Sequence, residues 1–434
     1  MREMKDSGIQ WLREYPANWN LIKIKYCLKE RVEKNNPVRT TDILSLTAKQ
    51  GVIPYDQKEG GGNKPKEDVS AYRLAYPGDI VMNSMNILSG SVGLSNYFGC
   101  VSPVYYMLRP IDKSEDVRFY NYIFQSTVFQ RSLYGLGNGI LIKESGNGKL
   151  NTIRMRIPID KFGGLFIPVA PIQEQKKIAD FLDAKCAEID ALTADIQTQI
   201  DTLEQYKRSI ITEAVTRGLN PDVEMKDGGN QYWGSIPTNW HLSDIKYLFE
   251  IVKRIAGKEG YDILSVTQKG IKIKDISNNE GQVAESYANY QFVYPGDFVM
   301  NHMDLLTGWV DCSKLFGVTS PDYRVFRLRD KNNSLNYYKY IMQTCYMNRI
   351  FYSLGQGVSN LGRWRLQTSS FNNFMVPVPP VEVQESIANY LDKKCTEINA
   401  CIDDKQRQLE VLEEYKKSLI YEYVTGKKEV PENA

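Results

Sequence analysis

The sequence contains little histidine, no paired cysteines and no long apolar run. His241 and His302 are the only histidines in 434 residues, which argues against histidine-based nucleophilic or metal chemistry. The seven cysteines are scattered and form no Cys-x-x-Cys pair, so we expect reduced thiols in a cytosol rather than disulfides or a zinc site. No apolar run reaches the ~18 residues of a membrane span, and Met1–Gln10 lacks the apolar core of a signal peptide. These absences predict a cytoplasmic protein.

The sequence also lacks the short motifs of enzymes that act on nucleotides or DNA. It has no Gly-x-x-x-x-Gly-Lys-Ser/Thr phosphate loop, no Asn-Pro-Pro-Tyr-like tetrapeptide of amino-methyltransferases and no Pro-Asp…Glu-x-Lys nuclease cluster. Pro321-Asp322 comes nearest to that cluster, but it lacks the partner carboxylate and lysine. No helical pattern follows the glycine-rich run Gly135–Gly139, so we interpret it as a turn or DNA-facing loop rather than a nucleotide site. The chain is therefore expected to bind and not to catalyse.

The formal net charge of +2 conceals alternating basic and acidic blocks. Residues 20–170 contain 20 Lys and Arg against 13 Asp and Glu, and residues 241–379 contain 16 against 12. In residues 171–217 and 380–426 the balance is reversed, with 6 against 9 and 6 against 10. Basic surface attracts the phosphate backbone, which repels acidic surface. The two basic blocks are therefore the candidate nucleic-acid binders.

An internal repeat covers nearly the whole chain. Tyr76-Pro-Gly-Asp-Ile-Val-Met-Asn83 returns as Tyr294-Pro-Gly-Asp-Phe-Val-Met-Asn301. The offset between the copies falls from 221 residues in the first motifs to 209 in the last, and nine of the extra residues of the first copy lie between Gly139 and Arg154. Such a long period indicates a duplicated domain and not a solenoid, whose repeats are far shorter.

Each copy is predicted to contain a short arm, a mixed globular block and one long helix. The segments are an N-terminal arm (1–19), a first block (20–170), a long helix (171–218), a linker with a second arm (219–240), a second block (241–379), a second long helix (380–426) and a tail (427–434). Strand-like runs such as Asp79–Met82, separated by Gly and Pro turns, indicate mixed blocks. The predicted fold class is α+β: two mixed α/β domains separated by two long antiparallel coiled-coil helices, with a pseudo-two-fold internal repeat.

Both long helices carry heptad patterns without internal Pro or Gly. The residues expected to form the seam between them are Leu182, Ile189, Leu192, Ile196, Leu203, Tyr206 and Ile210 in the first helix and Leu391, Ile398, Cys401, Leu412, Tyr415 and Leu419 in the second. Gln199, Lys405 and Gln408 interrupt the seam, which is typical of a pair with one register and one partner. Roughly 45 residues at ~1.5 Å each give a rod of about 65–70 Å. Pairing of the two helices is favoured over the alternative, in which each helix packs only on its own block.

Sequence-specific DNA binding needs side chains that reach base edges and cations that hold the phosphates. Asn and Gln suit adenine, Arg suits guanine or phosphate, and glycine lets the backbone approach closely. The candidate DNA-binding residues are Ser84, Asn86, Asn138, Lys143, Asn147, Lys149, Arg154 and Arg156 in the first block and His302, Asp304, Gln356, Ser359, Asn360, Arg363 and Arg365 in the second. For each of them, plain solvated surface is the alternative. No catalytic and no metal-binding residue is predicted. Because the scaffolds match and the loops differ, we expect an asymmetric bipartite target.

Motifs in the arms and at the helix ends carry a family resemblance. They are Met-Lys-Asp-Ser-Gly…Trp-x-x-x-x-Pro-x-x-Trp, Pro-x-x-x-Gln…Ile-x-x-(Phe/Tyr)-Leu-Asp and Tyr-Lys-(Arg/Lys)-Ser. In these motifs the sequence resembles the specificity subunits of type I restriction-modification enzymes over essentially its full length. The resemblance implies two target-recognition domains, with conserved antiparallel helices between them that act as a ruler on double-stranded DNA.

The resemblance also implies partners and their cofactors. Two modification subunits would bind S-adenosylmethionine and methylate one adenine in each half-site, and restriction subunits would use ATP and Mg. Methylation of a base in duplex DNA requires base flipping, which the partner would perform. This chain would hold no cofactor, and its arms and outer helix faces would dock the modification subunits.

Two other functions are alternatives to DNA recognition. A self-sufficient nuclease or methyltransferase is opposed by the missing catalytic motifs. A coiled-coil protein–protein adaptor without DNA readout would account for the helices equally well. It would not account for the two basic blocks with their Gly, Asn and Arg loops.

Overall fold

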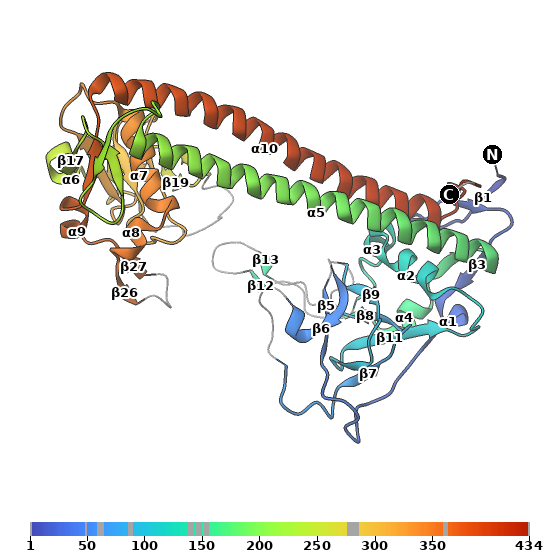
Figure 1. Cartoon of the computed structure of the whole chain (residues 1–434). Coiled ribbons are helices and arrows are strands. Elements are labelled where there is room, and N and C mark those ends of the chain that lie inside the picture. The colour runs from blue at the N-terminus through green and yellow to red at the C-terminus, as the bar shows by residue number, and fades with distance from the viewer. Residues whose placement is uncertain are drawn as a thin grey trace. The chain divides into compact units, whose positions relative to one another are not determined.

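The computed structural model describes residues 2–47, 50–58, 65–85, 90–137, 143–144, 150–151, 156–275, 286–358 and 363–432. The chain divides into two compact units, whose elements are labelled in Figure 1. Unit 1 comprises Met1–Ser145, Leu150–Ile196 and Arg407–Ala434, and unit 2 comprises chiefly Gln197–Gln406. Each unit therefore contains one block of the repeat together with part of both long helices.

Unit 1 begins with an arm of two strands and continues into the first block. Its elements are β1 (Met4–Asp6), β2 (Glu14–Pro16), β3 (Asn20–Lys23), α1 (Ile24–Cys27), β4 (Leu28–Glu30), β5 (Leu44–Thr47), β6 (Gly51–Pro54), the 3-10 helix η1 (Tyr55–Gln57), β7 (Arg73–Ala75), β8 (Ile80–Asn83), β9 (Val92–Leu94), β10 (Gly99–Val101), β11 (Tyr105–Pro110), α2 (Val117–Gln125), α3 (Thr127–Ser132), β12 (Lys143–Glu144), β13 (Leu150–Asn151), α4 (Ile159–Gly163) and β14 (Phe166–Val169). The long helix α5 (Ile172–Arg217) follows.

Unit 2 repeats this order, except that η1 has no counterpart among its described residues. Its elements are β15 (Met225–Asp227), β16 (Ser235–Pro237), β17 (His241–Asp244), α6 (Ile245–Leu248), β18 (Phe249–Val252), β19 (Leu264–Thr267), β20 (Gly270–Ile273), β21 (Gln291–Val293), β22 (Phe298–Met300), β23 (Val310–Cys312), β24 (Gly317–Thr319), β25 (Arg324–Leu328), α7 (Leu335–Met347), α8 (Ile350–Ser353), β26 (Gln356–Val358), β27 (Arg363–Arg365), α9 (Thr368–Asn372) and β28 (Met375–Val378). The second long helix is α10 (Val381–Val424).

A four-stranded antiparallel sheet forms the centre of each unit. Its strand order is β4-β11-β8-β9 in unit 1 and β18-β25-β22-β23 in unit 2. Successive side chains of a strand point to opposite faces. Ile80 and Met82 therefore join the large core that contains α2, while Val81 joins a second core with the β5–β6 hairpin. In unit 2, Phe298 and Met300 of β22 likewise lie in the large core, while Val299 lies in a second core.

The repeated Tyr-Pro-Gly-Asp motif is a turn stabilised by a buried ion pair. Asp79 accepts hydrogen bonds from Arg31 at 3.0 and 3.1 Å and from the backbone N–H of Tyr76 at 3.0 Å. Arg254 and Asp297 form the same pair in unit 2, at 2.7 Å. Asp79 is only 1% exposed, so its charge would be costly without this partner. The motif therefore belongs to the shared scaffold.

Each long helix is joined to its own block by a buried glutamine. Gln175 donates to the carbonyl oxygen of Ala170 at 2.9 Å and accepts from the backbone N–H of Asp116, the N-cap of α2, at 3.0 Å. Gln384 makes the corresponding bonds in unit 2. Both glutamines are 1% exposed. The Pro-x-x-x-Gln motif thus connects the first turn of the long helix to the start of α2 or α7.

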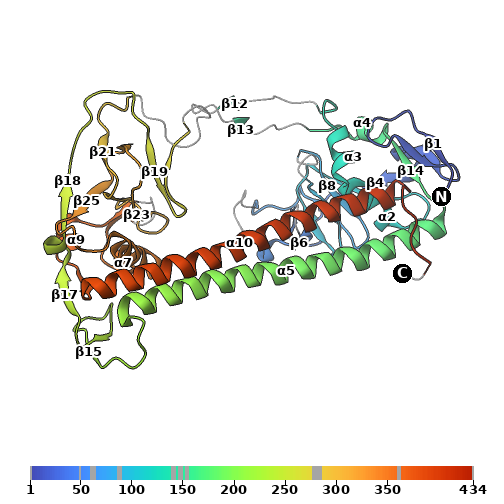
Figure 2. The same ribbon diagram turned by 90° about the horizontal axis from the view of Figure 1, so that it is seen from above.

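In unit 1 the first part of α5 lies beside the last part of α10, and the two helices run antiparallel (Figures 1 and 2). The Nζ atom of Lys416 donates to the Asp190 carboxylate at 2.6 Å. The rings of Phe181 and Tyr423 lie 4.5 Å apart. These contacts confirm the expected antiparallel pairing within this unit.

Unit 2 contains the matching pair, formed by the end of α5 and the start of α10. Lys207 donates to Asn399 at 2.7 Å, which is the counterpart under the repeat of the Lys416 contact in unit 1. Lys405 donates to Gln199, so two of the polar residues that interrupt the seam contact each other. Among the described residues, none of the helices combines the length and the apolar character that crossing a membrane requires.

The predicted seam is correct at one heptad position and wrong at the other. Leu182, Ile189, Ile210, Leu391, Ile398 and Leu419 are buried, and Ile196, Leu203 and Leu412 are partly buried. The intermediate residues are exposed: Leu192 by 47%, Tyr206 and Tyr415 by 53% each, and Cys401 as well.

The second buried heptad position lies four residues after the first, and not three residues after it as predicted. Cys186, Ile200, Cys395 and Ile402 are buried there. Apolar character alone favours Leu192 and Tyr206, but these lie three residues after the preceding seam residue. The helix brings Lys207 inward at the fourth residue, and the aliphatic stem of a lysine packs against apolar neighbours while its amine reaches a polar one.

The C-terminal end of α10 closes on the N-terminal arm of unit 1, as Figure 2 shows. Tyr421 donates from its hydroxyl to the carbonyl oxygen of Trp11 at 3.1 Å. Gly426, at φ +70°, follows α10 beside Trp19, and Gly218, at φ +79°, follows α5 beside Trp240. Glycine adopts this left-handed conformation after a helix without steric cost. The arm–helix junction is thus the same in both units.

The revised seam predicts which substitutions destabilise unit 2. Replacement of Ile200, which is 4% exposed, by Ala is expected to cost about 2–4 kcal/mol because it leaves a cavity between the helices. Replacement of Tyr206 by Ala on the same helix is expected to change stability by less than about 0.5 kcal/mol. Urea denaturation followed by circular dichroism measures both. Equal losses, or a larger loss for Tyr206→Ala, would restore the seam predicted from hydrophobicity.

Candidate nucleic-acid interface

Two segments that are separate in sequence meet at one end of the central sheet in each unit. In unit 2 the backbone N–H of Leu366, directly after β27, donates to the carbonyl oxygen of His302, just after β22, at 3.0 Å. In unit 1 the N–H of Ile157 donates to the carbonyl oxygen of Ser84, also at 3.0 Å. The structure therefore brings the loop after the Tyr-Pro-Gly-Asp strand next to Arg156 in unit 1 and Arg365 in unit 2.

The hairpin β26–β27 carries three of the predicted contact residues of unit 2, Gln356, Arg363 and Arg365. Its register pairs Gln356 with Arg365 and Gly357 with Trp364, and both Gln356 and Arg365 are exposed. Trp364 lies on the other side of its strand and donates from Nε1 to the carbonyl oxygen of Tyr352 at 2.7 Å. The hairpin is thus attached to α8 through an aromatic side chain and presents a Gln–Arg pair to solvent.

Gly355 makes this attachment possible. A Cβ atom at this position would lie 2.4 Å from Nε1 of Trp364, so a larger residue would displace the indole. Close packing against Trp364 therefore requires glycine at position 355.

His302 lies beside two arginines and is neutral at physiological pH. Burial lowers its pKa to about 4, and the nearby positive charges of Arg324 and Arg365 act in the same direction. Its Nδ1 atom is buried and has no hydrogen-bond partner among the described residues. A neutral imidazole has one donor and one acceptor nitrogen. His302 therefore remains a candidate for a base contact.

Two of the predicted DNA-binding residues serve the loops themselves. Ser84 is fully buried and donates from its hydroxyl to the carbonyl oxygen of Val104 at 2.7 Å, so the predicted DNA contact of its side chain is wrong. Asp304 accepts from the backbone N–H groups of Leu306 and Thr307 at 3.0 and 2.9 Å. Burial raises the pKa of Asp304, but hydrogen bonds from the Thr307 hydroxyl and from these backbone N–H groups outweigh burial and lower it. The carboxylate of Asp304 stabilises a turn, which a short acidic side chain in a Gly-rich loop commonly does.

Of the remaining predicted DNA-binding residues, the structure describes only some. Arg156 is exposed at the end of its loop, and Lys143 and Arg363 fall within β12 and β27. Asn86, Asn138, Asn147, Lys149, Arg154, Ser359 and Asn360 lie outside the described residues.

Sequence reasoning missed the residues that hold the loops from below. Tyr346 donates from its hydroxyl to the carbonyl oxygen of Asn301 at 2.8 Å, and Arg324 lies 5% exposed beneath His302. Aligning the two repeats places Arg324 opposite Tyr106. The replacement of a tyrosine in one copy by an arginine in the other was the available signal for this site.

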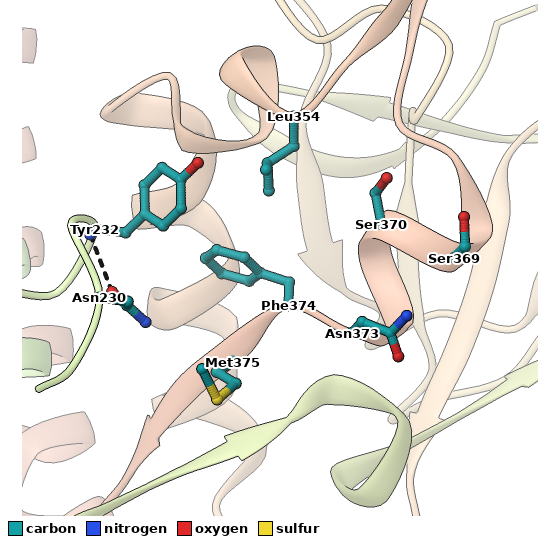
Figure 3. A pocket seen from close by; sticks show the side chains of 8 residues that line it. All are labelled: Asn230, Tyr232, Leu354, Ser369, Ser370, Asn373, Phe374 and Met375. Carbon is teal, nitrogen blue, oxygen red and sulfur yellow. Dashed lines mark hydrogen bonds between the residues drawn. The ribbon is translucent and has the colours of Figure 1, made fainter.

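Figure 3 shows a hollow of about 400 Å³ on unit 2, between its arm and the α9–β28 turn. The side chains that line it are Asn230, Tyr232, Leu354, Ser369, Ser370, Asn373, Phe374 and Met375. None of these is charged at neutral pH, so no lining side chain can form an ion pair with phosphate. The candidate interface is therefore the loop cluster and not this hollow.

Comparisons with known proteins show which family the sequence resembles. Residues 237–411 match the family model of the type I restriction modification DNA specificity domain. The chain is 25% identical over 292 residues to the type I restriction enzyme MjaVIII specificity subunit of Methanocaldococcus jannaschii, which is 62% of this chain and 64% of that protein. It is 24% identical over 279 residues to the putative type I restriction enzyme MjaX specificity subunit of the same organism, 61% of this chain and 59% of that protein. The match thus spans less than two thirds of either relative.

A solved structure extends the comparison to nearly the whole fold. A chain from a study of the structural basis of complex assembly and conformational transition of the type I R-M system superposes with a TM-score of 0.66. The superposition covers 95% of this chain and 99% of that chain at 13% identity. The protein is therefore of the class with two similar α+β units and two long helices. Its second repeat, over residues 237–411, is similar to the type I restriction modification DNA specificity domain.

The buried imidazole predicts a pH dependence of unit 2. The pKa of His302 is about 4 in the folded chain and ~6.5 when unfolded, so the unfolded chain binds more protons between these values. Stability is therefore complete above about pH 6.5 and is lost as the pH falls towards 4, by about 2 kcal/mol at pH 5. Thermal unfolding at pH 7 and pH 5 measures this loss. His302→Ser introduces the serine of the first repeat and should remove this loss of stability at low pH. The control, His241→Ser at the exposed histidine, should retain the loss. An identical pH dependence of stability in His302→Ser and the unmodified chain would contradict the assignment.

Proposed function

We propose that this chain is the DNA-specificity subunit of a type I restriction-modification complex and that each unit reads one half of an asymmetric bipartite site. The observation that carries the proposal is duplication with divergence. The two units share their sheets, ion pairs and helix junctions, yet their exposed loops differ in sequence and in length. A common scaffold with unequal loops suits two different half-sites, because base contacts decide sequence while the scaffold decides position.

The partners proposed for this chain supply the chemistry. Two modification subunits bind S-adenosylmethionine and methylate an adenine at N6 in each half-site, and restriction subunits use ATP and Mg for translocation and cleavage. This chain is non-catalytic and positions them on duplex DNA. The long helices act as the spacer between half-sites, and their outer faces with the arms dock the modification subunits.

The proposed base contacts come from the exposed residues of the loop clusters. Gln356 and Arg365 are paired across the hairpin of unit 2, and this combination suits neighbouring adenine and guanine. Arg156 occupies the position of Arg365 in unit 1. Asn86, Asn138, Lys143, Asn147, Lys149, Arg154, Ser359, Asn360 and Arg363 remain proposed contacts on their residue type alone.

Methylation sequencing tests the proposal directly. DNA from cells with this chain and its modification subunit is compared with DNA from cells that lack only this chain. A split motif with N6-methyladenine in both halves, present only with this chain, is the expected result. If no motif disappears on deletion, the purified complex is tested for sequence-selective DNA binding at several salt concentrations. Binding without sequence preference, or no binding, would favour the protein–protein adaptor.

Substitution of the two equivalent arginines tests which half-site each unit reads. Arg365→Ala is expected to cost about 1–3 kcal/mol of discrimination at one base pair in one half of the motif. Arg156→Ala should act on the other half. Arg365→Lys retains the charge without the bidentate geometry, so it should restore phosphate affinity but not the base preference. Competition binding with single-base variants of the site gives these values. Equal effects of Arg365→Ala on both halves would contradict the assignment of one half-site to each unit.

A further inference from the structure

In both units one buried side chain of the central sheet holds the segment that leaves the candidate DNA-reading loop. In unit 1, Tyr106 on β11 donates from its hydroxyl to the carbonyl oxygen of Ile157 at 3.0 Å. In unit 2, Arg324 on β25 donates from Nη2 to the carbonyl oxygen of Leu366 at 3.0 Å. The sheet register confirms that these positions are equivalent, because Tyr106 pairs with Met82 and Arg324 with its counterpart Met300.

The same two loop residues are held a second time through their backbone N–H groups. Ile157 donates to Ser84 and Leu366 donates to His302, each at 3.0 Å. Both Ile157 and Leu366 are almost completely buried, at 1% and 0% exposure. The residue immediately before each is the exposed arginine of its loop cluster. The backbone at Arg156 and Arg365 is therefore attached both to the sheet and to the neighbouring loop.

The arginine is a costly way to make this attachment. Arg324 is only 5% exposed, and no carboxylate among the described residues forms an ion pair with it. Its guanidinium lies 4.5 Å from the ring centroid of Phe371 and donates to Thr368 at 3.3 Å. An apolar side chain would fill this space without the cost of burying an unpaired charge. Two chemically different side chains, a phenol and a guanidinium, thus make the same hydrogen bond at the same place.

We propose that Tyr106 and Arg324 are positioning residues for DNA readout, each of which holds the arginine-bearing end of its own loop against the sheet. The inference rests on the proposed function. Base contacts of this kind require supporting residues that hold the contacting group to within about 0.5 Å. Loss of the hydrogen bond therefore relaxes sequence preference in one half-site and leaves the other half-site unchanged.

The test uses the full chain assembled with its modification subunits and a library of bipartite DNA sites with randomised bases. Tyr106→Phe removes one hydroxyl and keeps the ring, while Arg324→Met removes the donor and keeps the length of the side chain. Arg324→Tyr introduces the donor that unit 1 uses. Selection from the library gives the preference at each base pair, and thermal unfolding of each variant is measured beside it.

Tyr106→Phe is expected to reduce discrimination about tenfold at base pairs of one half-site only, the size of one good base contact. Arg324→Met should reduce discrimination by a similar factor in the other half-site, and Arg324→Tyr should restore discrimination there. If both variants lower the unfolding temperature while both half-sites keep their preference, the residues are merely structural and the inference is overturned. Equal relaxation of both half-sites overturns it as well.

The controls separate this inference from the proposed function. If the unmodified complex selects no sequence, the proposed function itself fails. If it selects a split motif that the variants leave intact, only the positioning role fails. Should Arg324→Met not fold, Tyr106→Phe and Arg324→Tyr decide, because both keep a side chain of similar size in the core.

Discussion

The attachment of each long helix to its own block is the interaction on which the rest of the structure depends. Buried Gln175 and Gln384 connect the first helical turn to the block, and two turns later Asp183 and Asp392 each accept a 2.6 Å hydrogen bond from a tyrosine hydroxyl of α2 or α7. An amphipathic helix that is free to rotate about its axis could present any of its faces to the partner helix. Because these bonds set the rotation of each helix relative to its block, the same face always meets the partner helix.

That constraint explains why two unequal loop clusters are compatible with one scaffold. The contacts that hold each unit together are duplicated, from the buried Asp79 and Asp297 turns to the glycines that follow α5 and α10. Among the described residues, the loop clusters are attached to this scaffold through a few groups. They include one backbone N–H and one side-chain donor on the central sheet in each unit, the hydroxyl of Ser84 in unit 1, and Trp364 and Tyr346 in unit 2. Side chains outside those attachment points are therefore free to differ. The scaffold of a duplicated chain can in this way stay the same while its loops diverge.

The candidate site was only partly predictable. Gln356, Arg365 and Arg156 were predicted because their residue types suit base or phosphate contacts and they lie in or after Gly-rich runs. The structure shows that all three are exposed. Ser84 was misassigned because a serine next to a loop can either face solvent or be buried beneath the loop. Only its hydrogen bond to the carbonyl oxygen of Val104 shows that it is buried. Arg324 was missed because residue type alone does not distinguish a buried cation from an exposed one. Its significance depends on a hydrogen bond to Leu366, 42 residues away in the chain.

The sequence by itself determined the duplication, the mixed blocks, the two long helices and their antiparallel pairing, because repeats and heptads are properties of residue order. It also determined that charge is segregated between blocks and helices. Only the tertiary structure decided which helical face is buried. Leu192 and Tyr206 are more apolar than Lys207, yet the bonds that orient α5 on its block bring Lys207 inward and leave the other two in solvent. The free energy of a helix pair depends on rotation set by distant contacts, and no local pattern contains that information.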